Sequence, residues 1–194
     1  MSRQHHRPMF PGDRFFEAIE RGVDPAAVTE AAEVAAAVLV RGARAAGDEV
    51  TAQRVLTLAD TEGMETLAEL WSHAPAHTLA GCLWRLYLLR GWVHTAPLSA
   101  AEEYDAGHRV AEVARVVAGV EEPPGPDEVR LMVDDVLRGI VRTDFADVLL
   151  RAAAFARVVA VGRAALGRGN DTAILTLSEQ LEAAAHAELD HGLG

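Results

Sequence analysis

The stretch at residues 78–95 reads TLAGCLWRLYLLRGWVHT and contains only two charged side chains, Arg85 and Arg90. Along one side of a helix its apolar residues recur three, four or seven positions apart: Leu79, Leu83, Leu86 and Val93. A second apolar row recurs every four residues: Trp84, Leu88 and Trp92. Because a helix that is apolar on nearly all sides is typical of a protein interior, we predict that residues 78–95 form the buried central helix.

The length of this stretch also raises the possibility of a membrane span. About eighteen residues are just enough to cross a bilayer as a helix. The two arginines argue against this, because each would cost roughly 2.5–3.5 kcal/mol at the bilayer centre. Gly91 lowers the helix propensity further. We therefore predict a soluble core helix and a protein without membrane contacts.

Composition predicts a globular, cytoplasmic protein. The 194 residues are 50% hydrophobic and 24% charged, which is ordinary for a chain that buries a sizeable core. The net charge of −11 disfavours direct binding to nucleic acid, because it repels the phosphate backbone. The single cysteine, Cys82, cannot form a disulfide framework, which is typical of a reducing cytoplasm. The N-terminal residues lack the apolar segment of a secretory signal.

Helical periodicity continues along most of the chain, and no alternating strand pattern interrupts it. We predict an all-α protein, a single-domain irregular bundle of about eight helices. Residues 1–13 are expected to form a disordered tail, residues 14–169 the bundle and residues 170–194 a peripheral C-terminal helix.

Local signals place two further helix starts. Ser99 is expected to cap a helix that runs to about residue 117. Thr143 or Asp144 is expected to cap residues 144–166, whose centre is as apolar as the central helix. We expect residues 144–166 to be the packing partner of residues 78–95.

The sequence contains no recognisable catalytic motif. The sequence lacks the GxxxxGK[ST] phosphate loop, the GxSxG nucleophile elbow and the HExxH metal motif. Asp105 and His108, and likewise Glu188 and His191, lie one helical turn apart. Di-iron bundles use this spacing but add two glutamates from other helices. Because one pair uses aspartate and the other lies close to the C-terminus, we favour surface positions and predict no catalytic, cofactor or metal residues.

Arg85 and Arg90 are the most informative charges, because a guanidinium on a buried helix needs carboxylates or carbonyls. Four carboxylates are candidate partners: Asp60, Glu62, Asp144 and Asp147. Structural pairing is the favoured interpretation. The alternative is a pocket between residues 78–95 and 144–166, in which either arginine binds an anion. Three aromatic residues would then form its walls: Trp84, Tyr87 and Trp92.

The last predicted helix, residues 171–189, has a narrow apolar stripe between polar flanks: Ile174, Leu177 and Leu181. Because short isolated helices are marginal in water, this one is expected to dock on something. Docking on its own domain is the simplest outcome, but the same stripe could also pair with its copy in a second chain. We predict a homodimer with these three residues at or near the contact, since two-fold dimers are the commonest oligomers.

Four segments resemble a set of small helical proteins from high-GC actinobacteria. They are FFEAIERGVDPAAVTEAAEVAAAVLVRGARAAGD at 15–48, HAPAHTLAGCLWRLYLLRGWV at 73–93, VVAGVEEPPGPDEVRLMVDDVLRG at 116–139 and DFADVLLRAAAFARVVAVGRA at 144–164. The resemblance implies an all-helical fold without an assigned activity. Some members carry a name borrowed from the RNA polymerase β subunit, which implies at most an association with transcription. No site residues follow from it.

The leading functional hypothesis is a non-enzymatic interaction or adaptor protein, because catalytic motifs are missing, the predicted helices have acidic faces, and the final helix is expected to be peripheral or partly detached. Its partner protein is not specified by the sequence. The alternative is a small-molecule-binding protein or enzyme that uses the pocket described above. For stability, we predict that Trp84→Ala costs roughly 3–5 kcal/mol, the usual penalty for truncating a buried aromatic residue.

Overall fold

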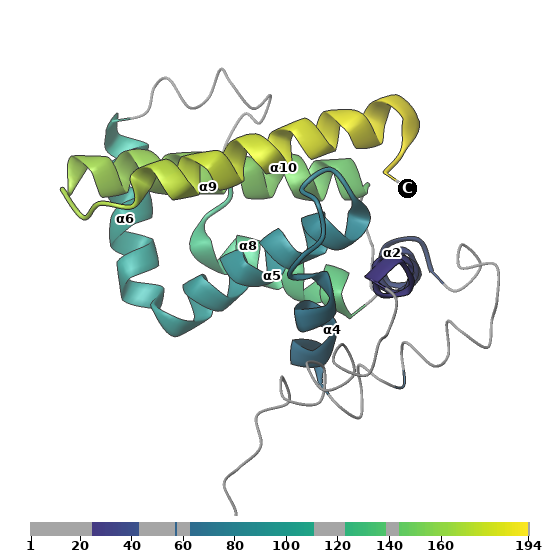
Figure 1. The fold of residues 1–194 in the computed structure, drawn as a ribbon. Helices are drawn as coiled ribbons and strands as arrows, with labels where there is room; N and C mark the ends of the chain where they lie inside the picture. The colour runs from purple at the N-terminus through teal and green to yellow at the C-terminus, as the bar shows by residue number, and fades with distance from the viewer. Residues whose placement is uncertain (1–24, 43–56, 58–62, 111–122, 139–143, 194) are drawn as a thin grey trace, which may run out of the picture.

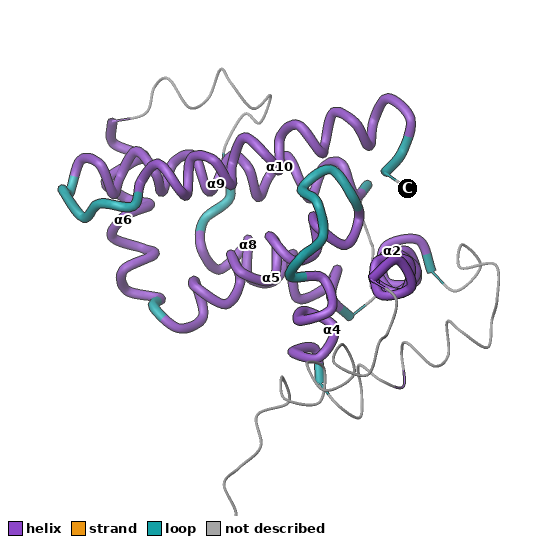
Figure 2. The backbone as a smooth tube through the Cα atoms, viewed as in Figure 1, coloured by secondary structure: helices purple, strands orange, loops and turns teal. Residues whose placement is uncertain are grey.

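A computed structural model describes residues 25–42, 57, 63–110, 123–138 and 144–193, and this part of the chain consists of helices and the loops that join them, without strands (Figures 1 and 2). Its helices are α2 (Pro25–Arg41), α4 (Met64–Trp71), α5 (Leu79–Thr95), α6 (Pro97–Val110), α8 (Pro126–Leu137), α9 (Phe145–Ala165) and α10 (Asp171–His191). These seven helices confirm the predicted all-α class. No helix in these ranges is long and apolar enough to cross a membrane. The predicted tail at residues 1–13 lies outside the described residues, as do Asp60 and Glu62.

Local capping explains where two of the central helices begin. The hydroxyl of Thr78 accepts a hydrogen bond of 3.2 Å from the N–H of Gly81 at the start of α5. The carboxylate of Asp144 accepts one of 3.0 Å from the N–H of Ala146 at the start of α9, so Asp144 is the cap of the two that were predicted. α6 begins at Pro97, before the predicted Ser99, because proline suits the first turn of a helix.

The helices pack in two groups that share the core. α9 and α10 run side by side, and α6 crosses α9 at one end (Figure 1). α5 packs mainly on α8 and α2. The prediction that α9 is the main packing partner of α5 is therefore wrong. The two helices touch only over a small area, where Trp92 meets Phe155. α9 is the more buried of the two helices, with more than half of its residues in the interior.

The crossing of α6 with α9 depends on two glycines. A Cβ atom on Gly107 would lie 1.9 Å from the carbonyl oxygen of Val158, and one on Gly162 would lie 1.7 Å from the carbonyl oxygen of Glu103. Both distances are far below van der Waals contact. The two backbones touch directly, and no other residue type fits without moving a helix.

Burial of α5 is one-sided, which changes the assignment of the tryptophans. The row of Leu79, Leu83, Leu86 and Val93 is in the core. Trp84 is only partly buried and stacks on Tyr87, with ring centroids 6.0 Å apart. The fully buried tryptophan is Trp71 on α4, whose indole N–H donates to the carbonyl of Ala32 at 3.2 Å. The predicted cost of 3–5 kcal/mol for a buried aromatic residue therefore applies to Trp71.

α10 is part of the bundle along its whole length. The buried hydroxyl of Ser178 donates to the carbonyl of Ala153 on α9 at 2.8 Å. At the far end, the guanidinium of Arg41 donates two hydrogen bonds to Glu188, at 2.9 and 2.8 Å, and one to the carbonyl of Leu193 at 2.9 Å. The final helix is therefore anchored to α9 and to α2, and it is not partly detached.

Candidate functional site

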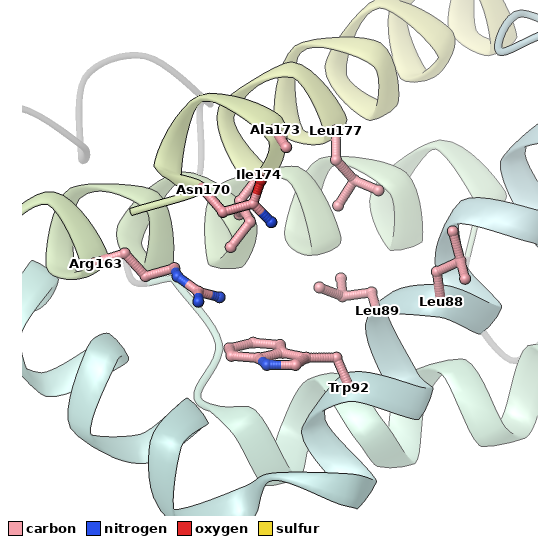
Figure 3. A pocket seen from close by; sticks show the side chains of 8 residues that line it. All are labelled: Leu88, Leu89, Trp92, Arg163, Asn170, Ala173, Ile174 and Leu177. Atoms are coloured by element: carbon pink, nitrogen blue, oxygen red, sulfur yellow. The ribbon is translucent and has the colours of Figure 1, made fainter. Parts of the chain in front are cut away.

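A pocket of about 290 Å³ opens between the second half of α5, the end of α9 and the first turns of α10 (Figure 3). Six of its residues are apolar: Leu88, Leu89, Trp92, Ala173, Ile174 and Leu177. The other two are Arg163 and Asn170. A mostly apolar cavity with a few polar groups at one end is the usual form of a small-molecule site.

The apolar wall comes from two helices that large side chains keep apart. Leu89 is buried at the base, while Trp92, Ile174 and Leu177 are half-buried. The ring of Trp92 is supported from behind by Phe155 of α9, with centroids 6.3 Å apart. Leu88 is 44% exposed and forms part of the rim. This wall would cover an apolar ligand on two sides.

Arg163 supplies the positive charge of the pocket. Its Nε donates to the carbonyl of Gly169 at 3.1 Å and lies 3.6 Å from a carboxylate oxygen of Glu103. Its side chain is 20% exposed. Figure 3 shows the guanidinium directed into the pocket beside the ring of Trp92. Within the part of the chain that the structure describes, no hydrogen bond or ion pair engages its two terminal nitrogens.

Asn170 forms the other polar group of the pocket. It is the residue before α10 and has a left-handed backbone with φ of 59°, which asparagine tolerates better than most residues. Its side chain makes no capping hydrogen bond to α10. The amide is therefore available to a ligand as both donor and acceptor.

Glu103 holds this polar end in place from behind. Its side chain is fully buried, and one carboxylate oxygen accepts from Ser99 at 2.9 Å and from Arg168 at 3.1 Å. Among the described residues, no group donates a hydrogen bond to the other oxygen, which lies 3.6 Å from Nε of Arg163. Arg168 also pairs with Glu102 on the surface. These contacts fix the connection between α9 and α10 to α6.

Of the five residues predicted for a ligand pocket, Trp92 lines the observed one, and the other four do not. Arg85 donates to the side chain of Gln180 at 2.7 Å and to the carbonyl of Gly81 at 2.8 Å. Arg90 pairs with Asp134. Asp134 is not one of the four predicted partners; it lies on α8 and is only 7% exposed.

Sequence reasoning missed Arg163 and Asn170. The available signal was an arginine in the last turn of an apolar helix, followed by the turn-forming residues Gly167 to Asn170. That signal indicates a helix end. It does not show that the arginine faces a cavity, because the position of α5 relative to α10 decides this.

The three residues predicted for a dimer contact differ in burial. Leu181 is fully buried inside the chain, so it is not available to a second copy. Ile174 and Leu177 are half-buried in the wall of the pocket.

Other reactive groups lie away from the pocket. Burial raises the pKa of the Cys82 thiol to about 12, so it is not a thiolate at neutral pH. Asp105, His108 and His191 are exposed, and Glu188 pairs with Arg41. Among the residues described, no three histidine, cysteine or acidic side chains gather as metal ligands would.

The fold and the site together define an all-α bundle with a small apolar pocket that is polar at one end. Comparisons with protein-family models, with curated proteins and with solved structures find no match to this chain. The resemblance to actinobacterial helical proteins therefore stays a prediction.

Proposed function

We propose that the protein binds a small, predominantly apolar molecule in the pocket between α5, α9 and α10. The observation that carries the proposal is the pocket itself, because six apolar residues from two helices line it and leave about 290 Å³ unfilled. The volume is at the lower end of the range for ligand sites, which favours a small ligand.

The proposal is for binding without a chemical step. The residues that line the pocket include no carboxylate, histidine, hydroxyl or thiol. General acid–base and nucleophilic catalysis require such groups within hydrogen-bond distance of the reacting atoms.

Calorimetric titration with 1-octanol tests the proposal. The native protein should bind it, and Ala173→Leu should abolish binding by filling the pocket. Ala183→Leu is the matched control, because Ala183 is exposed on the same helix and does not line the pocket. The proposal fails if the native protein binds no octanol, or if both variants bind it equally.

The adaptor hypothesis is the second candidate, with the homodimer as its simplest form. One observation favours it: Leu88 and Leu175 are 44% and 37% exposed, close to the half-buried Ile174 and Leu177. A second copy seated on this face would cover the pocket, so dimer formation and octanol binding would compete. Light scattering with and without octanol measures this, and a monomer under both conditions excludes the dimer.

A further inference from the structure

We infer that the pocket selects ligands with a single negative charge, a carboxylate at the end of an apolar body, and that Arg163 is the residue that recognises it. The inference rests on the proposed function and adds the chemistry of the head group. It assigns this role to an arginine on α9, and not to Arg85 or Arg90 on α5.

Arg163 is already positioned for a carboxylate. Its Nε is fixed by the carbonyl of Gly169 and by the charge of Glu103, which restricts rotation of the guanidinium. The two terminal nitrogens remain on the side facing the pocket (Figure 3). Two parallel N–H groups match the two oxygens of a carboxylate, and this paired geometry is stronger and more specific than a single contact. Little side-chain entropy is lost on binding, because the arginine is held before the ligand arrives.

The arrangement of the lining residues sets the direction of the ligand. Arg163 and Asn170 lie together at the end of the pocket formed by the α9–α10 connection, whereas Leu88, Leu89 and Leu177 lie at the other end (Figure 3). A ligand with its anionic group at the first end would place its apolar body between Trp92 and Leu177. Charged groups are costly to bury beside leucines, so the opposite orientation is unfavourable.

The charge around Arg163 makes a second negative charge on the ligand unfavourable. Arg163 and Arg168 are balanced by Glu102 and Glu103, which belong to the same cluster. A monoanion therefore adds one uncompensated charge close to the buried carboxylate of Glu103, and a dianion adds two. Like charges repel strongly where water is partly excluded. A carboxylate is accordingly favoured over a phosphate monoester, which carries nearly two charges at neutral pH.

Titration of the native protein with four probes of equal chain length tests the inference. The probes are octanoate, octyl phosphate, 1-octanol and octylammonium. We expect octanoate to bind about tenfold more tightly than 1-octanol, the effect of one hydrogen bond to a charged group. Octyl phosphate should bind no more tightly than octanoate, and octylammonium should bind most weakly.

Three variants then identify the residue responsible. Arg163→Gln should remove the preference for octanoate over 1-octanol while 1-octanol still binds. Arg163→Lys keeps the charge without the paired geometry and should retain part of the preference. Arg85→Gln is the control, since Arg85 is also a half-buried arginine but lines no part of the pocket, and the preference should be unchanged. Because the readout is a ratio within each variant, a change in stability alone does not alter it.

The outcomes separate this inference from the proposed function. Equal binding of octanoate and 1-octanol overturns the inference and leaves an apolar site. The inference is also overturned if the preference for octanoate persists in Arg163→Gln or is lost in Arg85→Gln, because a residue other than Arg163 would then recognise the carboxylate. If no probe binds to the native protein, both the inference and the proposed function are wrong.

Discussion

The crossing of α6 with α9 and the contact of α5 with α10 are built from opposite kinds of residue. At the first, Gly107 and Gly162 bring two backbones into direct contact, so that no additional atom fits. At the second, Trp92 and Leu177 keep the helices apart and leave about 290 Å³ between them. Both contacts belong to one bundle. They lie close together, because Gly162 of the crossing and Arg163 of the pocket are neighbours on α9, and they differ in packing and not in the type of secondary structure.

The difference has a simple physical origin. Glycine allows two helices to approach until their backbones touch, which leaves no room for a cavity. Large side chains interdigitate only when their shapes match, and a mismatch leaves a void whose walls lose their contacts. The space between α5 and α10 is open to the surface, since Leu88, Asn170 and Ala173 are exposed, so a ligand can reach it. The tight crossing thus has a structural role, whereas the loose contact is the place where binding is expected.

Adding one methyl group to the tight crossing should have the largest effect. Gly107→Ala places a Cβ atom 1.9 Å from the carbonyl oxygen of Val158, so the helices must separate. We expect a loss of about 3 kcal/mol or more in unfolding free energy, the upper range for overpacking. Urea denaturation followed by circular dichroism measures it.

Gly91→Ala is the matched control for that substitution. Gly91 lies within α5, and a Cβ atom there would meet nothing within 4 Å. We expect a gain of about 0.5–1 kcal/mol, because alanine is the better helix former. If the two variants have equal stability, α6 and α9 are not in backbone contact.

The second prediction concerns the buried carboxylate that links α6 to the end of α9. Glu103→Gln removes the only fully buried charge in the cluster with Arg163 and Arg168. We expect a loss of about 2 kcal/mol, less than for a fully buried pair, because both arginines are partly exposed. Glu102→Gln, at a carboxylate that is 63% exposed, should cost no more than about 0.5 kcal/mol. Equal melting curves for the two variants would show that Glu103 is reached by water.

The fold class and several helix starts could be predicted from the sequence, because the signals are local. Thr78 and Asp144 cap their helices through neighbours two or three residues away. The start of α6 at Pro97 is equally local, because proline suits the first turn of a helix, but Ser99 was predicted as the cap instead. Helical periodicity identifies the apolar sides of α5 and α9 in the same way.

The pairing of helices and the site could not be predicted, because they depend on which apolar sides meet. α5 has two apolar rows, and periodicity alone does not show that the row of Leu79 and Leu83 is buried while Trp84 is half-exposed. A glycine such as Gly162 inside an apolar helix indicates a close approach but not its partner. Arg163 becomes a pocket residue only through the position of α5.

The third prediction concerns the far end of α10, where Glu188 forms an ion pair with Arg41 of α2. Burial alone would raise the pKa of Glu188, but hydrogen bonds from Arg41 and from the N–H of Leu193 outweigh it and lower the pKa below 4.5. A lowered pKa stabilises the folded protein above the unfolded-state value, and this stabilisation is lost as the pH falls through the folded-state value.

Glu188→Gln should therefore cost about 1 kcal/mol at neutral pH, a modest value because Arg41 is 35% exposed. The difference from the native protein should shrink as the pH falls below 4.5. Thermal melting across a pH series measures it, with Glu179→Gln, an exposed position on the same helix, as control. A difference that does not change with pH would mean that the carboxylate is not charged in the folded state.

The smallest stability effect is expected at the pocket between α5 and α10. Ala173→Leu adds three carbon atoms at the pocket, whereas Gly107→Ala adds one at the tight crossing. We nevertheless expect the unfolding free energy of the Ala173→Leu variant to change by less than about 0.5 kcal/mol. The reason is that leucine is nearly as good a helix former as alanine, and its side chain enters space that is already open. The same urea denaturation measures both variants. If Ala173→Leu lost as much unfolding free energy as Gly107→Ala, the space beside α10 would be filled by side chains. The contrast between the two helix contacts would then be wrong, and so would the binding proposal that depends on it.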